Sequence, residues 1–585
     1  MSQTLFAKMD TTAEYLVSAV DQGDIGLPDI QRPFVWSASS VRDLFDSMFK
    51  GYPVGYLMLW DNPNESSSRQ IGTAGHGQDS PTTLIIDGQQ RLTSLYAVMK
   101  GKPVLDKNFH ERFIVIGFNP LKGKFEVTSS AIKRSSEWLP DLSAIFKQGT
   151  DSYSLVTNFL ERLRSSREVS GEEQSVIAKN IQRLLELKNY PFSALKIGLQ
   201  TDEEQVADIF VRVNSKGQNL KQADFILTLL SVFWEEGRQE LEAFCRDSRM
   251  PPTPGSGASP FNRHIKPDPD QLLRVAIAVG LRRARLKYAY QFLRGKDVES
   301  GEFVPEVREA NLKRLASAQQ KMLSLTNWHQ FLKCLTWAGF RSGKQISSDV
   351  ALLYSYAFYL IGKTEYGLDY SVLRQLIGRY FFMITLTSRY TGSFESAMDE
   401  DMARLRGIHS GEEFAQVMQG IIDTNLTDDF WKITLPGNLE TSSSSSAYLN
   451  AYHAAQNILG AKVLFSDVKI HELLDPEIAA PKSALEIHHL FPKAYLKSNR
   501  ITETRIINQI ANYALVEWED NIDISDSAPS EYIVRYEDRY HVDLESRYKE
   551  HALPAKWYEM SYDDFLQERR KLMAEVICQG FSKLS

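Results

Sequence analysis

The sequence is poor in cysteine and contains no long apolar run. Its 585 residues include only three cysteines, Cys245, Cys334 and Cys578, which are too scattered for a disulfide framework or a zinc knuckle. This usage fits a reducing cytosol. No run of about 18 apolar residues is present, and the N-terminus lacks the apolar core of a signal peptide. We therefore expect a cytoplasmic protein without membrane contact.

A general excess of positive charge is also missing. The formal net charge is −7, which argues against a protein that coats nucleic acid without discrimination. A local basic groove is not excluded, because binding depends on the patch rather than on the sum. The hydrophobic fraction of 43% and the charged fraction of 24% are those of an ordinary folded protein. The length predicts roughly two to four domains.

Two stretches rich in Pro, Gly or Ser, at 250–270 and 435–448, are expected to be loops or linkers. They divide the chain into 1–249, 250–434 and 435–585. The first part mixes helical and strand patterns, the second is almost entirely helical, and the last has two β-prone stretches followed by a helix. The sequence therefore predicts an α+β multidomain protein.

Hydrophobic spacing predicts several individual elements. Val41, Leu44, Phe45, Met48 and Phe49 indicate a helix that ends at Gly51. The other expected helices cover 270–293, 349–362 and the segment after Ser561, and the expected strands cover 52–60, 82–87, 113–118, 483–491 and 512–518.

The stretch "TLIIDGQQRLTSLYAVM" (83–99) has the pattern of a strand, a glycine turn and a helix. This layout directs backbone N–H groups toward the turn and suits an anion such as phosphate. Gly88 would permit close approach, Arg91 could bind a phosphate with both nitrogens, and Asp87 could hold a metal or a hydroxyl. A structural Asp–Arg pair at the same turn is the alternative.

The surroundings of this turn resemble a known domain. Residues 27–60, followed by "IDGQQRLTSL" and by "IFVRVNSKGQNLKQADFIL" (209–227), closely resemble the DGQQR-containing, ParB/sulfiredoxin-like α/β domain. The resemblance implies nucleotide binding or hydrolysis. The residues it implicates are Asp87, Gly88, Gln89, Gln90 and Arg91, with Gln31 and Arg32 as further candidates. Asn214 and Asp224 remain open between this role and those of a turn residue and a helix start.

The stretch "LEIHHLFPKAYL" (485–496) places two histidines side by side in a chain that has only 11. Chance could supply one exposed and one core histidine. Adjacent side chains on a strand point to opposite faces, however, so the two imidazoles could also divide their work, one binding a metal and the other a proton.

Together with "IANYALVEWEDNIDIS" (510–525), the histidine pair resembles the HNH, or ββα-metal, nuclease motif. The resemblance implies that His488 is a metal ligand and His489 the general base that activates water. It also implies that Asn512 fixes the loop and that Asn521 is the second metal ligand. Mg²⁺ or Mn²⁺ is the implied cofactor.

A further basic stretch, "LRRARLKYAYQFLRGK" (281–296), interleaves Arg and Lys with Tyr288 and Tyr290. On a helix it could follow a phosphate backbone, and the alternative is a solvated helix face.

A nucleotide-binding N-terminal domain joined through helices to an HNH domain resembles the GmrSD-type, modification-dependent (type IV) restriction endonucleases. The resemblance implies an NTP-dependent antiphage enzyme that cuts modified double-stranded DNA. The modification, the preferred NTP, nicking against double-strand cleavage, and a homodimer against a monomer remain open. The alternatives are a phosphorothioate-sensing nickase of the same architecture and a nucleotide-switched DNA-binding protein with an inactive HNH fold.

Overall fold

The computed structural model divides into two compact units, residues 1–238 and 239–585. The described residues are 5–28, 34–61, 68–69, 82–106, 111–146, 151–198, 201, 205–206, 209, 223, 226–227, 230, 234–255, 257–296, 304–474, 485–539 and 544–585. The domain boundaries predicted near 249 and 434 stay predictions. Sheet is concentrated at the N-terminus and the remainder is mainly helical, so the predicted α+β class is confirmed.

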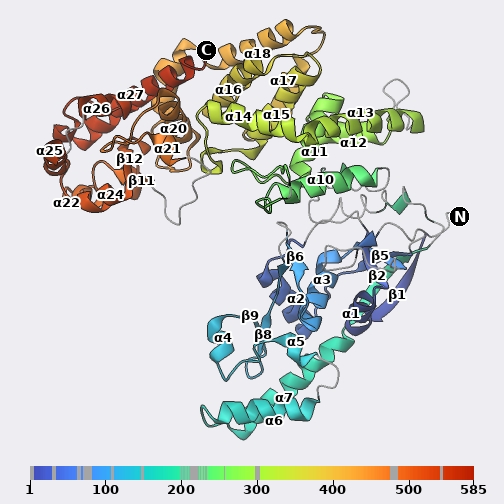
Figure 1. Cartoon of the computed structure of the whole chain (residues 1–585). Helices are drawn as coiled ribbons and strands as arrows, with labels where there is room; N and C mark the ends of the chain where they lie inside the picture. The colour runs from blue at the N-terminus through green and yellow to red at the C-terminus, as the bar shows by residue number, and fades with distance from the viewer. Residues whose placement is uncertain are drawn as a thin grey trace. The chain divides into compact units, whose positions relative to one another are not determined.

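The first unit is built on a six-stranded mixed sheet with the order β1-β10-β3-β5-β2-β4 (Figure 1). Its strands are β1 (Phe6–Thr12), β2 (Ile25–Pro28), β3 (Leu57–Asp61), β4 (Ser68–Arg69), β5 (Thr83–Asp87) and β10 (Pro191–Ile197). In the centre, β3 runs parallel to β10 and antiparallel to β5, which in turn runs parallel to β2.

Side chains alternate across the central strands of this sheet. Leu57, Leu59 and Ile85 face the large core under the helices, and Met58 and Trp60 join a smaller cluster on the other face. The helices of the large core are α1 (Ala13–Gln22), α2 (Ala38–Lys50) and α3 (Gln89–Lys100). Both faces of β3 and β5 are thus covered, which holds the end of β5 and the start of α3 in place.

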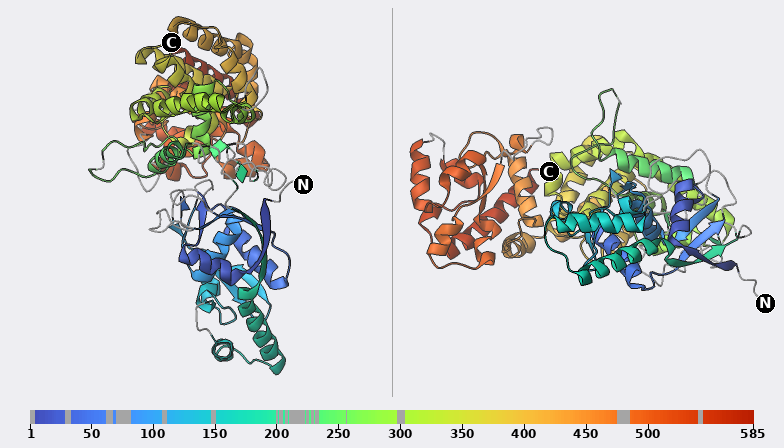
Figure 2. Two further views of the ribbon diagram at one scale, coloured as in Figure 1. Left: turned by 90° about the vertical axis from the view of Figure 1, so that its right-hand side faces the viewer. Right: turned by 90° about the horizontal axis from the view of Figure 1, so that it is seen from below.

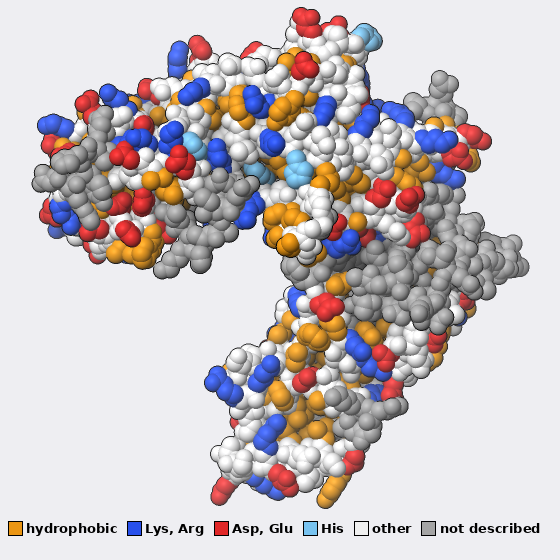
Figure 3. Space-filling view, viewed as in Figure 1, with side chains coloured by type: hydrophobic (Ala, Val, Ile, Leu, Met, Phe, Trp, Pro, Cys, Tyr) orange, Lys and Arg blue, Asp and Glu red, His pale blue; other side chains and the backbone are white. Residues whose placement is uncertain are grey.

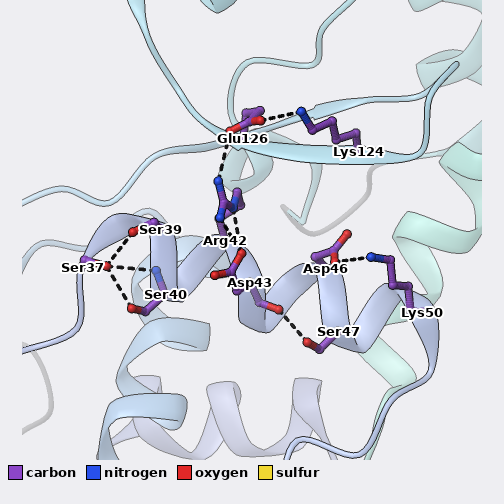
Figure 4. A network of polar contacts seen from close by, with 10 residues as sticks. All are labelled: Ser37, Ser39, Ser40, Arg42, Asp43, Asp46, Ser47, Lys50, Lys124 and Glu126. Atoms are coloured by element: carbon purple, nitrogen blue, oxygen red, sulfur yellow. Dashed lines mark hydrogen bonds and ion pairs between the residues drawn. The ribbon is translucent and has the colours of Figure 1, made fainter.

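The helix predicted over 41–49 is confirmed as α2. The Ser37 side chain caps its N-terminus, and Gly51 ends it with a left-handed φ of 76°. On its polar side, Arg42 pairs with Asp43 and with Glu126 of the strand β9 (Lys124–Val127) (Figure 4). The buried side packs into the core, so the helix is fixed on both sides.

Two predicted strands are shorter than expected. In 52–60, only 57–60 is strand, because Gly55 takes a φ of 91° that breaks the extended run. In 113–118, only the part from Ile116 is strand, since β8 (Ile116–Asn119) pairs with β9 from that residue on.

The remaining elements of the first unit are short hairpins and a pair of helices. They are β6 (Val104–Leu105), β7 (Glu111–Arg112), β8 (Ile116–Asn119), β9 (Lys124–Val127), α4 (Ser130–Arg134), α5 (Leu142–Ile145), α6 (Ser152–Arg164) and α7 (Gly171–Leu185). The helices α6 and α7 lie side by side, as both views show (Figure 1 and Figure 2).

The second unit is mainly helical. Its first helices are α10 (Glu235–Asp247), α11 (Pro269–Leu281), α12 (Leu286–Leu293), α13 (Pro305–Leu323), α14 (Leu325–Trp337), α15 (Asp349–Thr364), α16 (Tyr370–Leu386), α17 (Phe394–Ala403) and α18 (Gly411–Asn425). The predicted helix over 349–362 is confirmed as α15, which is buried on all sides. Among the described residues, no helix is long and apolar enough to span a membrane.

The prediction of a single helix over 270–293 is wrong. The segment forms two helices, α11 and α12, because Arg282 adopts a left-handed φ of 53° and ends the first one. Arg282, Arg283 and Arg285 therefore lie between the helices rather than along one helical face. The predicted loop at 250–270 is largely confirmed, since α11 begins at Pro269. The stretch 435–448 starts instead with a helical turn, α19 (Leu435–Asn438).

The C-terminal part of this unit surrounds a two-stranded antiparallel hairpin, β11 (Leu485–His489) and β12 (Tyr513–Glu517). Both strands were predicted, as was the last helix, which Ser561 caps. The surrounding helices are α20 (Ala447–Leu459), α21 (Ile470–Leu473), α22 (Lys493–Ser498), α23 (Thr504–Ile507), α24 (Trp518–Ile524), α25 (Pro529–Arg539), α26 (Leu544–Glu550) and α27 (Tyr562–Ser582).

Candidate functional site

The histidine pair lies at the end of β11, directly opposite the start of β12. His488 faces Ala514 and His489 faces Tyr513 in the antiparallel register. Helix α24 begins at Trp518, directly after β12, and carries Asn521. The local architecture is therefore strand, strand, helix, with the two histidines on opposite faces of the hairpin.

His488 points toward α24 and is only 3% exposed. Its Nδ1 lies 2.9 Å from Asn521 Oδ1. The amide oxygen only accepts, so Nδ1 carries the hydrogen and Nε2 keeps a lone pair. Among the described residues, Nε2 is buried without a hydrogen-bond partner. Burial lowers the pKa of His488 to about 4, so the imidazole is neutral near pH 7.

His489 lies on the other face and is half-buried. Its Nε2 lies 3.0 Å from Asn508 Oδ1 and donates to it, which leaves Nδ1 as the acceptor nitrogen. The Tyr513 ring packs edge-on against the imidazole at a centroid distance of 4.9 Å. Burial lowers the pKa of His489 as well. The ring is thus held in one tautomer and one orientation.

Asn512 is fully buried at the end of a short 3-10 helix, one residue before β12. Its Oδ1 accepts from the Phe491 N–H at 2.8 Å, and its Nδ2 donates to the carbonyls of Phe491 and Ile507 at 3.1 and 3.2 Å. One side chain thereby ties the segment after the histidines to the segment before β12.

Three residues that complete this arrangement were not predicted as site residues. Asn508 holds His489, and Tyr532 of α25 donates to the Leu490 carbonyl at 2.7 Å, with its ring edge-on to His488. Arg569 of α27 is fully buried and donates to the carbonyls of Ala511 and Tyr513, both at 2.7 Å. The only sequence signal was Arg569 itself, a cation on the apolar face of the last helix.

The donor set at His488 fits a small divalent cation. Ligands about 2.1 Å from an octahedral Mg²⁺ lie about 3.0 Å from each other when they are neighbours. His488 Nδ1 and Asn521 Oδ1 are 2.9 Å apart, and both could bind one cation if the ring hydrogen moved from Nδ1 to Nε2. Among the described residues, no group of three or more His, Cys, Asp or Glu side chains could hold a metal, so two protein ligands would leave the other positions to water and phosphate.

The predicted strand, turn and helix at 83–99 are present in the first unit. Asp87 ends β5, and α3 begins at Gln89 after Gly88, whose φ is 94°. A Cβ on Gly88 would lie 2.3 Å from a methyl of Leu57, so only glycine fits there.

Arg91 is engaged within the protein. It donates to the Val54 carbonyl at 2.7 Å and to Asp87 at 3.3 Å. The backbone crosses it closely, since a Cβ on Gly55 would lie 2.3 Å from Arg91 Nη1. Burial lowers the pKa of Arg91, and Asp87 opposes this shift. The turn thus contains the Asp–Arg pair that was the structural alternative.

The two glutamines of the motif lie in the first turn of α3. Gln90 Oε1 accepts from the N–H groups of Val35 and Trp36, at 2.9 and 3.2 Å, and Gln89 is buried. Gln90 therefore ties the segment before α2 to the turn. The other predicted residues, Gln31, Arg32, Asn214 and Asp224, lie outside the described residues.

Comparison with known proteins identifies the N-terminal part. An uncharacterised protein of Methanocaldococcus jannaschii is 21% identical over 543 residues, covering 88% of this chain and 85% of that protein. Residues 14–231, which include the sheet and the turn at Asp87, match the family model of the GmrSD restriction endonuclease N-terminal domain. The match lies within the first unit and does not include the hairpin at His488.

Proposed function

We propose that this protein is a metal-dependent DNA endonuclease that cuts with an HNH site at His488 and His489 and is controlled by nucleotide at its N-terminal domain. The GmrSD match supports a restriction endonuclease, and with it nuclease activity and DNA binding. The observation that carries the HNH site is the contact of His488 with Asn521 next to a second, separately oriented histidine.

The two histidines have different tasks in this mechanism. Asn508 binds the Nε2–H of His489, so the Nδ1 lone pair is the one that takes a proton from the attacking water. His488 and Asn521 would hold Mg²⁺ or Mn²⁺, which when bound neutralises charge growing on the scissile phosphate and steadies the leaving oxygen. Asn512 and Tyr532 keep the segment after His489 in register.

Nucleotide acts on the first unit in this proposal. HNH hydrolysis needs metal and water but no NTP, so nucleotide must act by favouring one arrangement of the enzyme over another. The sequence resemblance to the ParB/sulfiredoxin-like domain and the position of Asp87–Arg91 at a strand-to-helix turn support the proposal of an NTP site there. The substrate would be modified double-stranded phage DNA.

The metal test uses His488→Ala and Asn521→Ala on a supercoiled plasmid and on phage DNAs of different modification, with and without each NTP. Both variants should need at least about tenfold more Mg²⁺ or Mn²⁺ for half-maximal cleavage, since each loses one ligand. His409→Ala, an exposed histidine outside the hairpin, is the control. Wild-type cleavage by both variants at limiting metal would contradict the site.

A further inference from the structure

A cavity of about 1000 Å³ opens in the helical part of the second unit. Its wall comes from the connection between α11 and α12, from α12 itself, and from the segment that enters and leaves α17. None of the hairpin residues lines it. The cavity belongs to the region in which the basic stretch 281–296 was singled out by its sequence.

The wall of the cavity is positively charged. Five of its side chains are cationic and two are acidic, so the wall carries an excess of three positive charges in a chain with a net charge of −7. The cationic residues are Arg283, Arg285, Lys296, Arg389 and Arg406. Figure 3 shows basic and acidic side chains interspersed over the described part of the face that it draws.

The two acids of the wall are already neutralised by their own partners. Asp399 accepts from the Ala284 N–H at 2.6 Å and pairs with Arg285, and Glu400 pairs with Arg404. Arg389 is likewise bound, by the buried Asp401 at 2.6 Å.

Three cations of the wall remain available for a ligand. Among the described residues, Arg283, Lys296 and Arg406 have no ion-pair partner, and Arg283 lies over the Phe292 ring at 5.7 Å. Helix α17 adds to the positive field, because its N-cap Ser393 and first-turn residue Ser396 also line the cavity.

The cavity also has an aromatic wall. Tyr288, on α12, is 42% exposed and lies beside Phe292 in the lining. Cations that bind phosphate next to a ring that can stack on a base are the combination used for unpaired nucleic acid. Small-molecule sites measure roughly 300–1,000 Å³, so this cavity is at the upper end and has room for more than a mononucleotide.

We propose that this cavity binds an unpaired stretch of a DNA strand. Arg283, Lys296 and Arg406 hold its phosphates, and Tyr288 stacks on a base. The proposal rests on the proposed function in that DNA is the substrate. It adds a second binding site, distinct from the proposed metal site, that holds one DNA strand.

The test measures binding of a labelled single-stranded oligonucleotide by anisotropy, in EDTA, with a duplex and with ATP or GTP as competitors. The triple variant Arg283→Ala/Lys296→Ala/Arg406→Ala should raise the Kd at least about tenfold. It should also reduce the slope of log Kd against log salt by about 2, since each lost phosphate contact removes about 0.7. Tyr288→Ala should raise the Kd at least about fivefold without changing the slope.

The matched control is Lys287→Ala/Lys313→Ala/Arg314→Ala, which removes three exposed cations of α12 and α13 that do not line the cavity. It should bind like the wild type. A thermal melt of each variant checks folding, and the milder Arg283→Gln/Arg406→Gln variant replaces the triple one if that does not fold.

An unchanged Kd and salt slope in the triple variant overturns the proposal. The proposal is also overturned if the triple variant still binds the oligonucleotide but ATP or GTP no longer competes with it. That result would assign the cavity to a free nucleotide. Because the measurement needs no metal and no cleavage, it separates this proposal from the HNH site. If His489→Ala still cleaves DNA while the triple variant loses binding, the HNH site fails and the cavity stands.

Discussion

The turn at Asp87 and the hairpin at His488 differ in how their polar groups are satisfied. At the turn, Arg91 bonds to Val54 and Asp87, and Gln90 holds two backbone N–H groups, so these side chains join three segments of the first unit. At the hairpin, a ring nitrogen of His488 is buried with no partner among the described residues.

The difference matters because a buried polar atom without a partner costs about 1–3 kcal/mol. The hydrogen bonds of Arg91 and Gln90 are sufficient to account for these side chains as structural residues. A ligand at the turn would have to compete with those bonds. At His488, the unpartnered Nε2 can take the ring hydrogen when a cation replaces it at Nδ1 beside Asn521. The hairpin is therefore the better candidate for a catalytic site, and the bonds seen at the turn account for a structural role.

The largest expected effect comes from replacing His489, the proposed general base. His489→Ala should reduce plasmid cleavage by about 10²–10⁴-fold, since it removes the proton acceptor. Thermal stability should change little, because the ring is only half-buried. Cleavage rates and melting curves on the same preparation check both statements. Cleavage by His489→Ala at the wild-type rate would show that His489 is not the general base.

The next effect is on stability rather than on chemistry. Asn512→Ala deletes three hydrogen bonds and leaves one N–H and two carbonyls of the loop without this partner. We expect a loss of about 2–4 kcal/mol in the free energy of unfolding. Urea unfolding of the full chain measures it. Asn499→Ala, an exposed asparagine between α22 and α23, is the control. Equal stability of the two variants would show that the loop does not depend on Asn512.

At the turn, Arg91→Ala should weaken nucleotide binding roughly tenfold or more, and remove any effect of NTP on cleavage, if the guanidinium also reaches a phosphate. Arg164→Ala, an exposed arginine at the end of α6, should behave as wild type. Nucleotide affinity and the melting temperature are measured together. A lower melting temperature with unchanged affinity would reduce the turn to architecture.

The smallest effect tests how His489 is oriented. Asn508→Ala removes the acceptor of the Nε2–H, and one such bond is worth about 0.5–1.5 kcal/mol. Cleavage should fall by up to about tenfold, with the metal requirement unchanged. Asn508→Asp, which keeps an acceptor oxygen, should restore most of the rate. If neither substitution changes the rate, Asn508 does not position the base.

Much of this arrangement was readable from the sequence because it is local. The strand at 83–87, the helix that Gly51 ends, and both strands of the hairpin follow from side-chain spacing over a few residues. Helix limits were less predictable where a single residue leaves the regular conformation, as Arg282 does between α11 and α12.

The partners of the candidate residues were harder to foresee. Asn508 meets His489 from a separate segment, and Arg569 reaches β12 from the last helix. Gly55 lies against Arg91 only because β3 and β5 are neighbours in the sheet. Each of these contacts depends on tertiary packing, which spacing along one segment does not encode.

The contacts of Arg569 also affect the order in which parts of the protein fold during synthesis. Its guanidinium supplies the donors for two carbonyls at the start of β12, yet α27 is synthesised well after both strands of the hairpin. Chains fold from the N-terminus while they are being translated. The hairpin thus stays incomplete on the ribosome until the last helix packs against it. The histidine hairpin is therefore completed only after the first unit has had time to fold.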